Sequence, residues 1–229
     1  MKAVIFAAGE GKRLHPLTLD RPKPLVEVHG KALIHHIWEV LPETIDEVVV
    51  VVGYKGDMMR TFLGDEFLGK RVTYVEQDEP LGTAYALNLC RPHLEHEEKF
   101  LLMYADDLHS KISIEQCLGH EGAILVSFVD DPRRFGVVVP RADGTVQNIE
   151  EKPEHPKSNL AATGVYVLTP KIFDYKSSQA QNGEHYLTDM IAGFVKDYPV
   201  QVVESDFWVP IAYPHDIARA EEILASMNI

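Results

Sequence analysis

Five consecutive valines, Val48 to Val52, constrain the fold of this chain more than any other feature of its sequence. An apolar run without polar alternation is typical of a strand buried on both faces, as in a parallel sheet with helices on both sides. Similar strands are predicted at 4–7, 71–77 and 99–107, and patterns near the helical period separate them at 31–41, 55–64 and 82–94. This alternation predicts a parallel sheet with right-handed crossovers.

After residue 120 the pattern changes to strands with few helices between them. These strands are predicted at 123–129, 135–140, 145–151 and 161–168, and helical spacing returns at 170–176, 186–196 and 214–227. The fold class expected is α/β, a Rossmann-like and mostly parallel sheet flanked by helices, with a small antiparallel lobe. Without a linker or low-complexity tract, residues 1–229 are expected to form one domain with two lobes, 1–120 and 121–229.

The composition excludes several classes of protein. A net charge of −13 argues against a nucleic-acid partner, because such a surface must be basic. No apolar run approaches the roughly 20 residues of a membrane span, and the first residues lack the features of a signal peptide. Cys90 and Cys117 have no ligand spacing. We expect a cytoplasmic protein that binds small molecules but no membrane, with homo-oligomerisation left open.

A flexible cationic loop follows the first predicted strand. In the segment AAGEGKRLHPLTLDRPKPL, residues 7–25, Gly9 and Gly11 can adopt positive φ and let backbone N–H groups approach a phosphate. Arg13 and Lys23 add positive charge to the loop, which begins at Ala8. Ligands of open α/β sheets bind beyond the carboxyl ends of the strands, which is where this loop starts. The loop is predicted to hold a triphosphate.

Two standard phosphate-binding motifs do not fit this loop. A dinucleotide fingerprint would have a third glycine where the chain has Leu14, and it would open a helix that Pro16 and Pro22 prevent. A P-loop would have glycine in place of Phe6, and Ser or Thr in place of Arg13. The missing glycine also disfavours a nicotinamide-dependent oxidoreductase.

A glutamine lies between the third predicted strand and the helix that follows it. The amide of Gln77 offers a donor and an acceptor side by side, which matches one edge of a pyrimidine ring. Gly82, at the start of the helix, leaves room for a flat base, and Pro80 and Thr83 belong to the same segment. An ordinary helix N-terminus is the alternative interpretation.

Two clusters of charge complete the candidate residues. Asp106 and Asp107 end a buried strand, where carboxylates suit a hard cation such as Mg²⁺, although a solvated turn is the alternative. Further along, the Glu151 carboxylate can accept from sugar hydroxyls while the Lys152 ammonium neutralises a phosphate. A strand-end ion pair is the alternative there.

The strings A-A-G-x-G-x-R-L-x-P-L-T and R-P-K-P-L, both within residues 7–25, resemble the signature of the sugar-phosphate nucleotidylyltransferases. Members of that family join a nucleoside triphosphate to a sugar 1-phosphate and release pyrophosphate. The resemblance implies that Gly9 and Gly11 wrap the triphosphate, that Arg13 contacts its phosphates and that Lys23 stabilises the charge that is transferred. It also implies that Asp106 binds the metal.

Two more segments carry the resemblance. The stretch from Gln77 to Ala84 is similar to the family's base-recognition segment, Q-x-x-x-x-G-[TL]-A. The stretch EEKPEHPKSNLAATGVY, residues 150–166, is similar to glucose-1-phosphate thymidylyltransferases. That similarity implies a sugar-phosphate pocket with the following residues: Gly136, Glu151, Lys152, Thr163, Gly164 and, from a later segment, Glu184. The resemblance extends from residue 2 to about residue 226.

The C-terminal part departs from the family pattern. The resemblance implies Trp-x-Asp-x-Gly, with the aspartate as the second protein ligand of Mg²⁺, but Pro210 and Ala212 stand at these two positions. Three outcomes remain open. Asp106 with substrate phosphates and waters can suffice, a nearby acid among Glu204, Asp206 and Asp216 can substitute, or catalysis is poor.

The sequence therefore predicts a magnesium-dependent nucleotidyltransferase. Its expected substrates are a pyrimidine nucleoside triphosphate, dTTP or UTP, and a sugar 1-phosphate, with glucose 1-phosphate favoured. Because of Pro210, the alternative is a non-catalytic regulatory protein that binds nucleotide sugars through a degenerate metal site.

Overall fold

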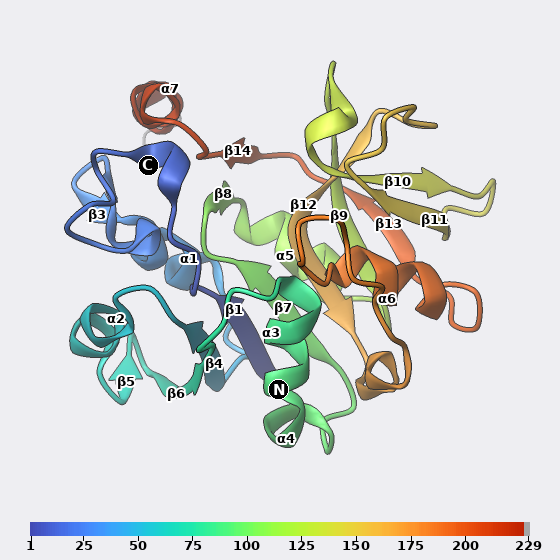
Figure 1. Ribbon diagram of the computed structural model, residues 1–229, viewed down its shortest axis with the longest axis horizontal. Coiled ribbons are helices and arrows are strands. Elements are labelled where there is room, and N and C mark those ends of the chain that lie inside the picture. Colours follow the sequence, from blue (N-terminus) through green and yellow to red (C-terminus); the bar gives the residue numbers. More distant parts are fainter. Residues whose placement is uncertain (227–229) are drawn as a thin grey trace.

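The computed structural model describes residues 1–226, in which four parallel strands form the centre of a ten-stranded sheet (Figure 1). They are β1 (Lys2–Phe6), β4 (Glu47–Val52), β6 (Lys70–Glu76) and β7 (Phe100–Tyr104). β1 lies between β7 and β4, and β6 pairs with β4. Val48 to Val52 are all fully buried, which confirms the prediction of a strand covered on both faces.

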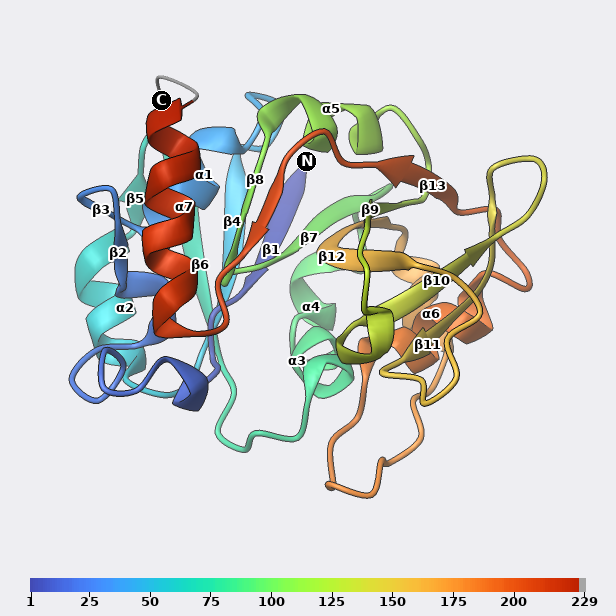
Figure 2. The ribbon, with the colours of Figure 1, turned by 90° about the horizontal axis from the view of Figure 1, so that it is seen from above.

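The five valines divide alternately between two hydrophobic clusters, one on each face of the sheet. Val49 and Val51 pack in the cluster that contains Leu87 of α3 (Thr83–Leu89) and Ile191 of α6 (Leu187–Phe194). Val48, Val50 and Val52 pack in the cluster that contains residues of α1 (Leu33–Val40), α2 (Gly56–Leu63) and α5 (Lys111–Leu118). Figure 2 shows α3 and α5 on opposite sides of the sheet.

The second half of the chain extends the same sheet through antiparallel strands, as the sequence predicted. β12 (Leu160–Leu168) runs antiparallel to β7. It also pairs with both β9 (Ala123–Phe128) and β10 (Gly136–Pro140), again antiparallel. β11 (Val146–Glu151) pairs with β10, and β13 (Gln201–Glu204) pairs with β9. At the other edge, β5 (Glu66–Phe67) pairs with β6, while β2 (Glu27–Val28) and β3 (Lys31–Ala32) form a separate hairpin.

Several elements differ from the sequence prediction. The helix expected at 82–94 is two helices, α3 and α4 (Arg91–Leu94), and the segment 170–176 forms a 3₁₀ turn, η4 (Pro170–Asp174), instead of an α-helix. The strand expected at 99–107 breaks after Tyr104 and resumes as β8 (Asp107–His109). Helix α5 and strands β13 and β14 (Trp208–Pro210) were not predicted.

A C-terminal segment runs from the antiparallel strands back to elements of the first half of the chain. We call residues 206–213 the strap: it leaves β13, pairs with β8 through β14, and leads into α7 (Pro214–Ser226). Val209 and Ile211 of the strap pack in a third hydrophobic cluster with Leu108, with α7 and with Leu14 of the opening loop. The position of that loop therefore depends on the strap. Residue 227, the last one predicted for the final helix, lies outside the described residues.

Across residues 1–226, none of the helices has both the length and the apolar character needed to cross a membrane. This agrees with the lack of a long apolar run in the sequence.

The two cysteines lie in the core on opposite faces of the sheet, Cys90 with α3 and Cys117 within α5, and both side chains are fully buried. Burial raises the pKa of each thiol to about 12. Because the thiolate is the reactive form, we expect neither thiol of the native protein to react with an aromatic disulfide reagent at pH 8. Both thiols should react in denaturant. A fast reaction of the native protein would contradict this burial.

Candidate active site

The predicted nucleotide-binding residues gather where the parallel strands end. The backbone turns beyond β1, β4 and β6 are tightly packed: a Cβ atom added to Gly53 would lie 3.1 Å from both the Cβ of Ala8 and the backbone oxygen of Gln77. The amide of Tyr54 donates to the carbonyl of Ala8 over 3.2 Å. The carboxyl edge of the sheet thus brings Ala8 and Gln77 together, although 69 positions separate them in the sequence.

The opening loop is folded around Gly11. This residue has φ +66°, its carbonyl accepts from the Thr18 hydroxyl over 2.9 Å, and a Cβ added to it would lie 3.0 Å from the Cβ of Lys23. Glycine is required here for both its backbone angle and the close approach. Gly9, by contrast, has open space around it.

The two cations predicted in this loop are held differently. Leu14 is fully buried in the third cluster and leaves its neighbour Arg13 exposed to solvent, in the turn η1 (Lys12–Leu14). The ammonium of Lys23, in the turn η2 (Lys23–Leu25), lies 3.1 Å from a carboxylate oxygen of Asp106. The Lys23 side chain is 14% exposed and that of Asp106 is 43% exposed, so the pair borders on solvent. The structure thus joins Lys23 and Asp106.

The segment predicted to recognise the base is paired with a loop of the second lobe. The Gln77 amide donates to the Gly82 carbonyl over 3.3 Å, and Pro80 is exposed. Gly82 has φ +97°, and the backbone of His185 lies directly against it. The backbone of His185 donates to Leu81 over 2.7 Å and accepts from Ala84 over 2.9 Å.

Thr83 adds to this pairing. Its hydroxyl accepts from the backbone N–H of Leu187, at 2.8 Å, so it links the two lobes in this structure. The predicted base-recognition segment and the segment that follows Glu184 are therefore hydrogen-bonded to each other.

The sugar-phosphate residues of the second lobe also lie together. Gly136 and Glu151 are opposite each other in the ladder of β10 and β11, and a Cβ added to Gly136 would lie 3.5 Å from the Glu151 carboxylate. Glu151 lies 2.9 Å from the Lys152 ammonium and accepts from the Thr188 hydroxyl over 3.3 Å. Lys152 also lies 5.1 Å above the ring of Tyr186.

Lys152 has a backbone that favours glycine. Its φ is +42°, in the left-handed region, and its N–H donates to the Phe135 carbonyl over 2.9 Å. A side chain in this region costs free energy, and residues held in this way are concentrated at functional sites. Holding a lysine rather than a glycine in this conformation is consistent with a function for its ammonium.

Three other predicted residues are placed less directly. Thr163 is 1% exposed, and its hydroxyl donates to the Leu125 carbonyl inside the sheet, so it does not offer this hydroxyl to a ligand. Gly164 has φ +84° and packs against the Tyr104 ring, which would lie 3.0 Å from a Cβ atom added to the glycine. Glu184 lies in the loop before α6, where its N–H donates to the Asn182 side chain over 3.1 Å.

Asp107 was only a secondary candidate in the sequence, but it has a specific place in the structure. Its two oxygens accept from the indole N–H of Trp208 over 2.8 Å and from the backbone N–H of Ile211 over 3.2 Å. Burial, and then the charge of Asp106, raise the pKa of Asp107 above its usual range against the opposing effect of Lys23 and these two donors. Asp107 also faces Pro210 in the ladder of β8 and β14.

Trp208 connects Asp107 to the second half of the chain at this point. Its ring packs edge to face with Phe135, with 5.4 Å between the ring centroids, and Phe135 adjoins Gly136 and accepts from the backbone of Lys152. Asp107 and Asp106 are neighbours in the chain. A short series of contacts thus links the Lys23–Asp106 pair to the Lys152–Glu151 pair.

Two of the three acids named as substitutes, Asp206 and Asp216, are already used by the fold, whereas Glu204 is exposed on β13. Asp206 accepts from the hydroxyls of Ser110 and Ser113 at the start of α5. Asp216 accepts from the backbone N–H groups of Ala212 and Tyr213, at 2.8 and 2.7 Å. Neither replaces the aspartate that Pro210 displaces.

The donor set fits a cation that takes few ligands from the protein. Across residues 1–226 no three His, Cys, Asp or Glu side chains are grouped as a metal cage would require. Mg²⁺ commonly binds one or two carboxylates together with substrate phosphates and waters. Asp106, which is exposed at the carboxyl edge of the sheet, is suited to be that one carboxylate.

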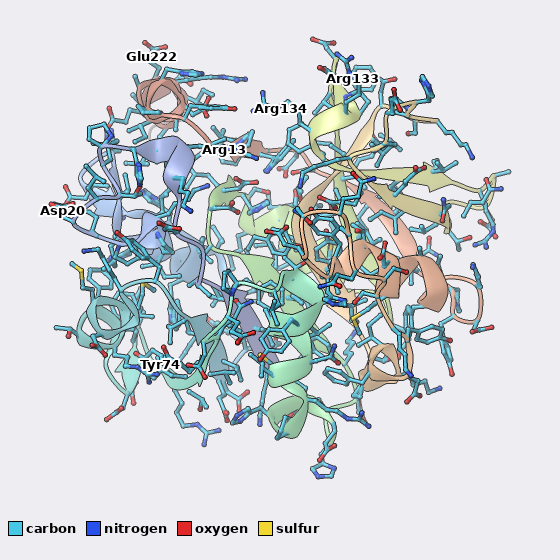
Figure 3. All side chains as sticks on the ribbon, in the orientation of Figure 1. Arg13, Asp20, Tyr74, Arg133, Arg134 and Glu222 are labelled. Carbon is cyan, nitrogen blue, oxygen red and sulfur yellow. The ribbon has the colours of Figure 1, made fainter. Side chains whose placement is uncertain are left out.

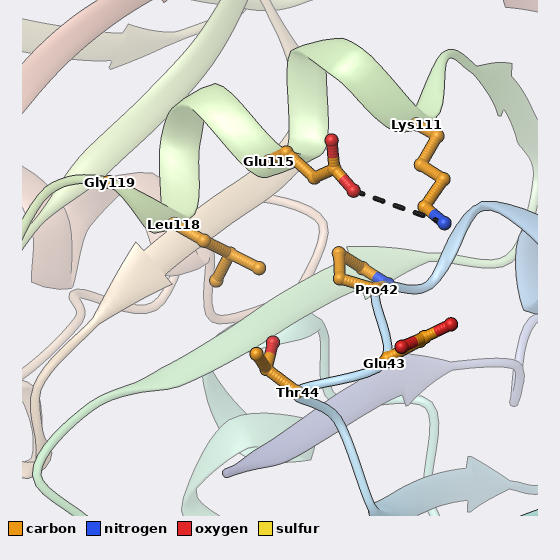
Figure 4. Close-up of a pocket in the computed structure, with 7 residues that line it drawn as sticks. All are labelled: Pro42, Glu43, Thr44, Lys111, Glu115, Leu118 and Gly119. Atoms are coloured by element: carbon orange, nitrogen blue, oxygen red, sulfur yellow. Dashed lines mark ion pairs between the residues drawn. The ribbon is translucent and has the colours of Figure 1, made fainter.

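Two grooves lie away from these residues. One, of about 510 Å³, is lined by residues of the loop before β4 and of α5, including Lys111 and Glu115, whose charged groups are 3.9 Å apart (Figure 4). The other, also about 510 Å³, lies beside the β2–β3 hairpin and α2. Neither contains a residue that the sequence predicted for the site.

Comparison with known proteins assigns the chain to a family. Residues 2–226 match the family described as Nucleotidyl transferase. The chain is 35% identical to the UTP–glucose-1-phosphate uridylyltransferase AglF of Haloferax volcanii over 236 residues, which cover 98% of this chain and 96% of AglF. It is 33% identical over 227 residues to the bifunctional protein GlmU of Methanocaldococcus jannaschii, of which it spans only 54%.

A solved structure agrees with the sequence relatives. A Bacillus anthracis protein described as a putative glucose-1-phosphate thymidylyltransferase, crystallised with a sucrose, superposes with a TM-score of 0.87 at 29% identity, covering 100% of this chain and 97% of the other. Both the fold and the resemblance predicted from the sequence are confirmed. The chain belongs to the nucleotidyl transferase family, the sugar-phosphate nucleotidylyltransferases.

Proposed function

We propose that this protein joins a pyrimidine nucleoside triphosphate, dTTP or UTP, to glucose 1-phosphate, producing a nucleoside diphosphate sugar and pyrophosphate. The observation that carries the proposal is the link between two cation–carboxylate pairs. Lys23–Asp106 and Lys152–Glu151 come from different lobes, and the contacts of Trp208 with Asp107 and Phe135 join them. Two anionic substrates would therefore bind close to each other.

The chemistry requires positioning and positive charge more than a general base. A phosphate monoester has a second pKa of about 6 and is largely dianionic at neutral pH, so its oxygen can attack the α-phosphorus without losing a proton to the protein. Lys23 would contact the α-phosphate, Arg13 the rest of the triphosphate and Lys152 the sugar phosphate. Mg²⁺ bound to Asp106 would neutralise charge that develops between the α- and β-phosphates.

The choice of substrates rests on the second lobe and on Gln77. Its amide can pair with the edge of uracil or thymine, which differ by one methyl group. AglF is a uridylyltransferase and the Bacillus anthracis protein is described as a thymidylyltransferase, and both names specify glucose 1-phosphate. Glucose 1-phosphate is therefore the sugar phosphate that we propose, with either pyrimidine nucleotide.

The test is a mass-spectrometric screen of the common nucleoside triphosphates against several sugar 1-phosphates with Mg²⁺. We expect a nucleotide sugar and an equal amount of pyrophosphate from a pyrimidine triphosphate and glucose 1-phosphate. Calorimetric binding of both substrates without any product across the screen would refute the transferase and favour a regulatory protein. Product from a purine triphosphate alone would refute the base assignment.

Lys152 provides a prediction that separates activity from stability. Replacing Lys152 by alanine should lower kcat/KM for glucose 1-phosphate by about 10²–10³-fold, the usual effect of removing one preorganised donor. Binding of the triphosphate, measured calorimetrically, should change little. Lys152→Gly should lose the same activity but be more stable than the alanine variant by about 1 kcal/mol, because glycine relieves the left-handed backbone at φ +42°.

Lys157→Ala is the matched control for that pair, because Lys157 lies in the same connection between β11 and β12 but outside the predicted pocket. It should leave both activity and stability nearly unchanged. An equal loss of sugar-phosphate use and of triphosphate binding in Lys152→Ala would show that the pocket is assigned wrongly.

A further inference from the structure

Arg134 lies beyond the predicted site, in a short turn of the second lobe. The turn η3 (Pro132–Arg134) carries two adjacent arginines with different surroundings. Arg133 is neutralised by Asp131, with its Nε and an Nη atom 2.8 and 2.9 Å from the two carboxylate oxygens. Within residues 1–226, no carboxylate lies within 4.0 Å of the Arg134 guanidinium or of Arg13. Arg141 and Arg219 also lack such a carboxylate within residues 1–226, so what distinguishes Arg134 is its position against residues 206–213.

The Arg134 side chain reaches from η3 to the strap. Its guanidinium carbon lies 5.3 Å from the centre of the Tyr213 ring, and Tyr213 stacks in turn on His215, with 5.5 Å between the ring centroids and 6° between the planes. Tyr213 ends the strap, whereas η3 belongs to the second lobe. Figure 3 shows Arg134 on the side of η3 that faces Arg13, while Arg133 lies at the outer end of η3.

The strap that supports Tyr213 is fixed at both ends. Asp107 binds it at Trp208 and Ile211, and Asp216 binds it at Ala212 and Tyr213. Ile211 packs in the same cluster as Leu14, the residue that follows Arg13. The strap therefore positions the Arg134 guanidinium through Tyr213 and supports the backbone of the loop that carries Arg13. A cation that is already in place binds an anion with little further ordering.

The sequence of the strap leaves Arg134 unneutralised. From Trp208 to Tyr213 it has no acidic residue, because proline occupies position 210. The two carboxylates that contact the strap, those of Asp107 and Asp216, already accept two hydrogen bonds each. An acid at position 210 would bring a negative charge to this part of the strap and weaken the binding of an anion here.

We propose that Arg134 is a second triphosphate-binding arginine, supplied by the second lobe, which contacts the β- and γ-phosphates that leave as pyrophosphate. This inference rests on the proposed function, because it places a polyphosphate beside Arg13. Arg13 and Arg134 would hold the polyphosphate from opposite sides, since planar guanidinium groups bind phosphate oxygens in pairs. Positive charge from Arg134 would replace part of the charge that is lost because Pro210 cannot bind a metal ion.

The test uses inorganic tripolyphosphate, which carries the phosphates without a base, and glucose 1-phosphate as the second probe. Calorimetry is done on the whole chain, in EDTA and again with Mg²⁺. Arg134→Gln should weaken tripolyphosphate binding about tenfold or more, the effect of losing a hydrogen bond to a charged group. Glucose 1-phosphate binding should stay within about twofold, because Lys152 carries that site. Tyr213→Leu removes the aromatic ring against which the Arg134 guanidinium packs but removes no charge. It should also weaken tripolyphosphate binding, but less than Arg134→Gln.

Arg133→Gln is the matched control, since it removes the same charge from the neighbouring position, and it should leave tripolyphosphate binding nearly unchanged. Equal losses in Arg133→Gln and Arg134→Gln would overturn the proposal, because they would indicate only a long-range effect of charge. A larger loss for glucose 1-phosphate than for tripolyphosphate would also overturn it. If Arg134→Gln behaves as expected but the wild-type chain makes no nucleotide sugar, the proposed function fails while this site stands.

Discussion

Replacing Lys23 by methionine should lower the rate of nucleotidyl transfer by about 10²–10³-fold or more, the effect expected for a preorganised cation aimed at developing charge. The Lys23 side chain is 14% exposed, and its Cβ contacts the position where Gly11 has no side chain. Its ammonium, 3.1 Å from Asp106, also lies beside the one carboxylate that we assign to Mg²⁺. Methionine keeps the packing of the stem and removes only the charge. Single-turnover kinetics with saturating substrates measure the effect.

The same substitution should leave the fold intact. Asp106 is 43% exposed, so loss of its partner should change the free energy of unfolding by no more than about 1 kcal/mol. Lys12→Met is the matched control, because Lys12 lies in the same loop, is 72% exposed and pairs with Glu10 over 2.9 Å. A Lys23→Met protein that retains its rate within about threefold would remove Lys23 from the reaction.

The central sheet could be predicted because its signal is local. The valines of β4 must be buried on both faces, and the helices on either side of that strand have clear apolar spacing. Helix α5 was missed because its sequence, KISIEQCL, has only a weak apolar stripe, and only Ser113, Ile114 and Cys117 of it are buried. The two-residue strands β2, β3 and β5 pair with near neighbours in the chain but are too short to show an apolar alternation. The three-residue strands β8 and β14 depend on each other across about a hundred residues, which no local pattern reveals.

The candidate site also has a part that the sequence could predict and a part that it could not. Gly11, Lys23, Asp106, Glu151 and Lys152 stand in recognisable strings, and the structure pairs Lys23 with Asp106 and Lys152 with Glu151. The supporting contacts could not be predicted, because they join positions about a hundred residues apart. Thr83 meets Leu187, and Asp107 meets Trp208, through hydrogen bonds that no motif records. The departure at Pro210 was visible in the sequence, but its neighbourhood, with Asp107 opposite, was not.

Gly82→Ala should destabilise the protein by about 3–4 kcal/mol, one of the largest effects expected from adding a single methyl group. At φ +97° and ψ −179°, Gly82 has a backbone that is essentially restricted to glycine. The added Cβ would lie 2.5 Å from the His185 oxygen and 2.7 Å from its nitrogen, and backbone atoms cannot rotate away. Relieving the overlap must separate His185 from Leu81 and Ala84, which breaks two hydrogen bonds. Urea unfolding followed by far-UV circular dichroism measures the loss.

Gly183→Ala separates the two causes of that loss. Gly183 lies in the facing loop with φ +84°, but nothing lies within 4 Å of its added Cβ, so the substitution has the backbone cost without the overlap. It should destabilise by only about 1 kcal/mol. The backbone cost is larger at Gly82, whose angles are essentially restricted to glycine. The difference between the two variants is then this extra strain plus the cost of separating the predicted base-recognition segment from the loop that carries Glu184. Because that pairing joins the two lobes, Gly82→Ala should also weaken the binding of both substrates. Equal destabilisation by the two substitutions would mean that the contact with His185 contributes nothing, and that the lobes are held together elsewhere.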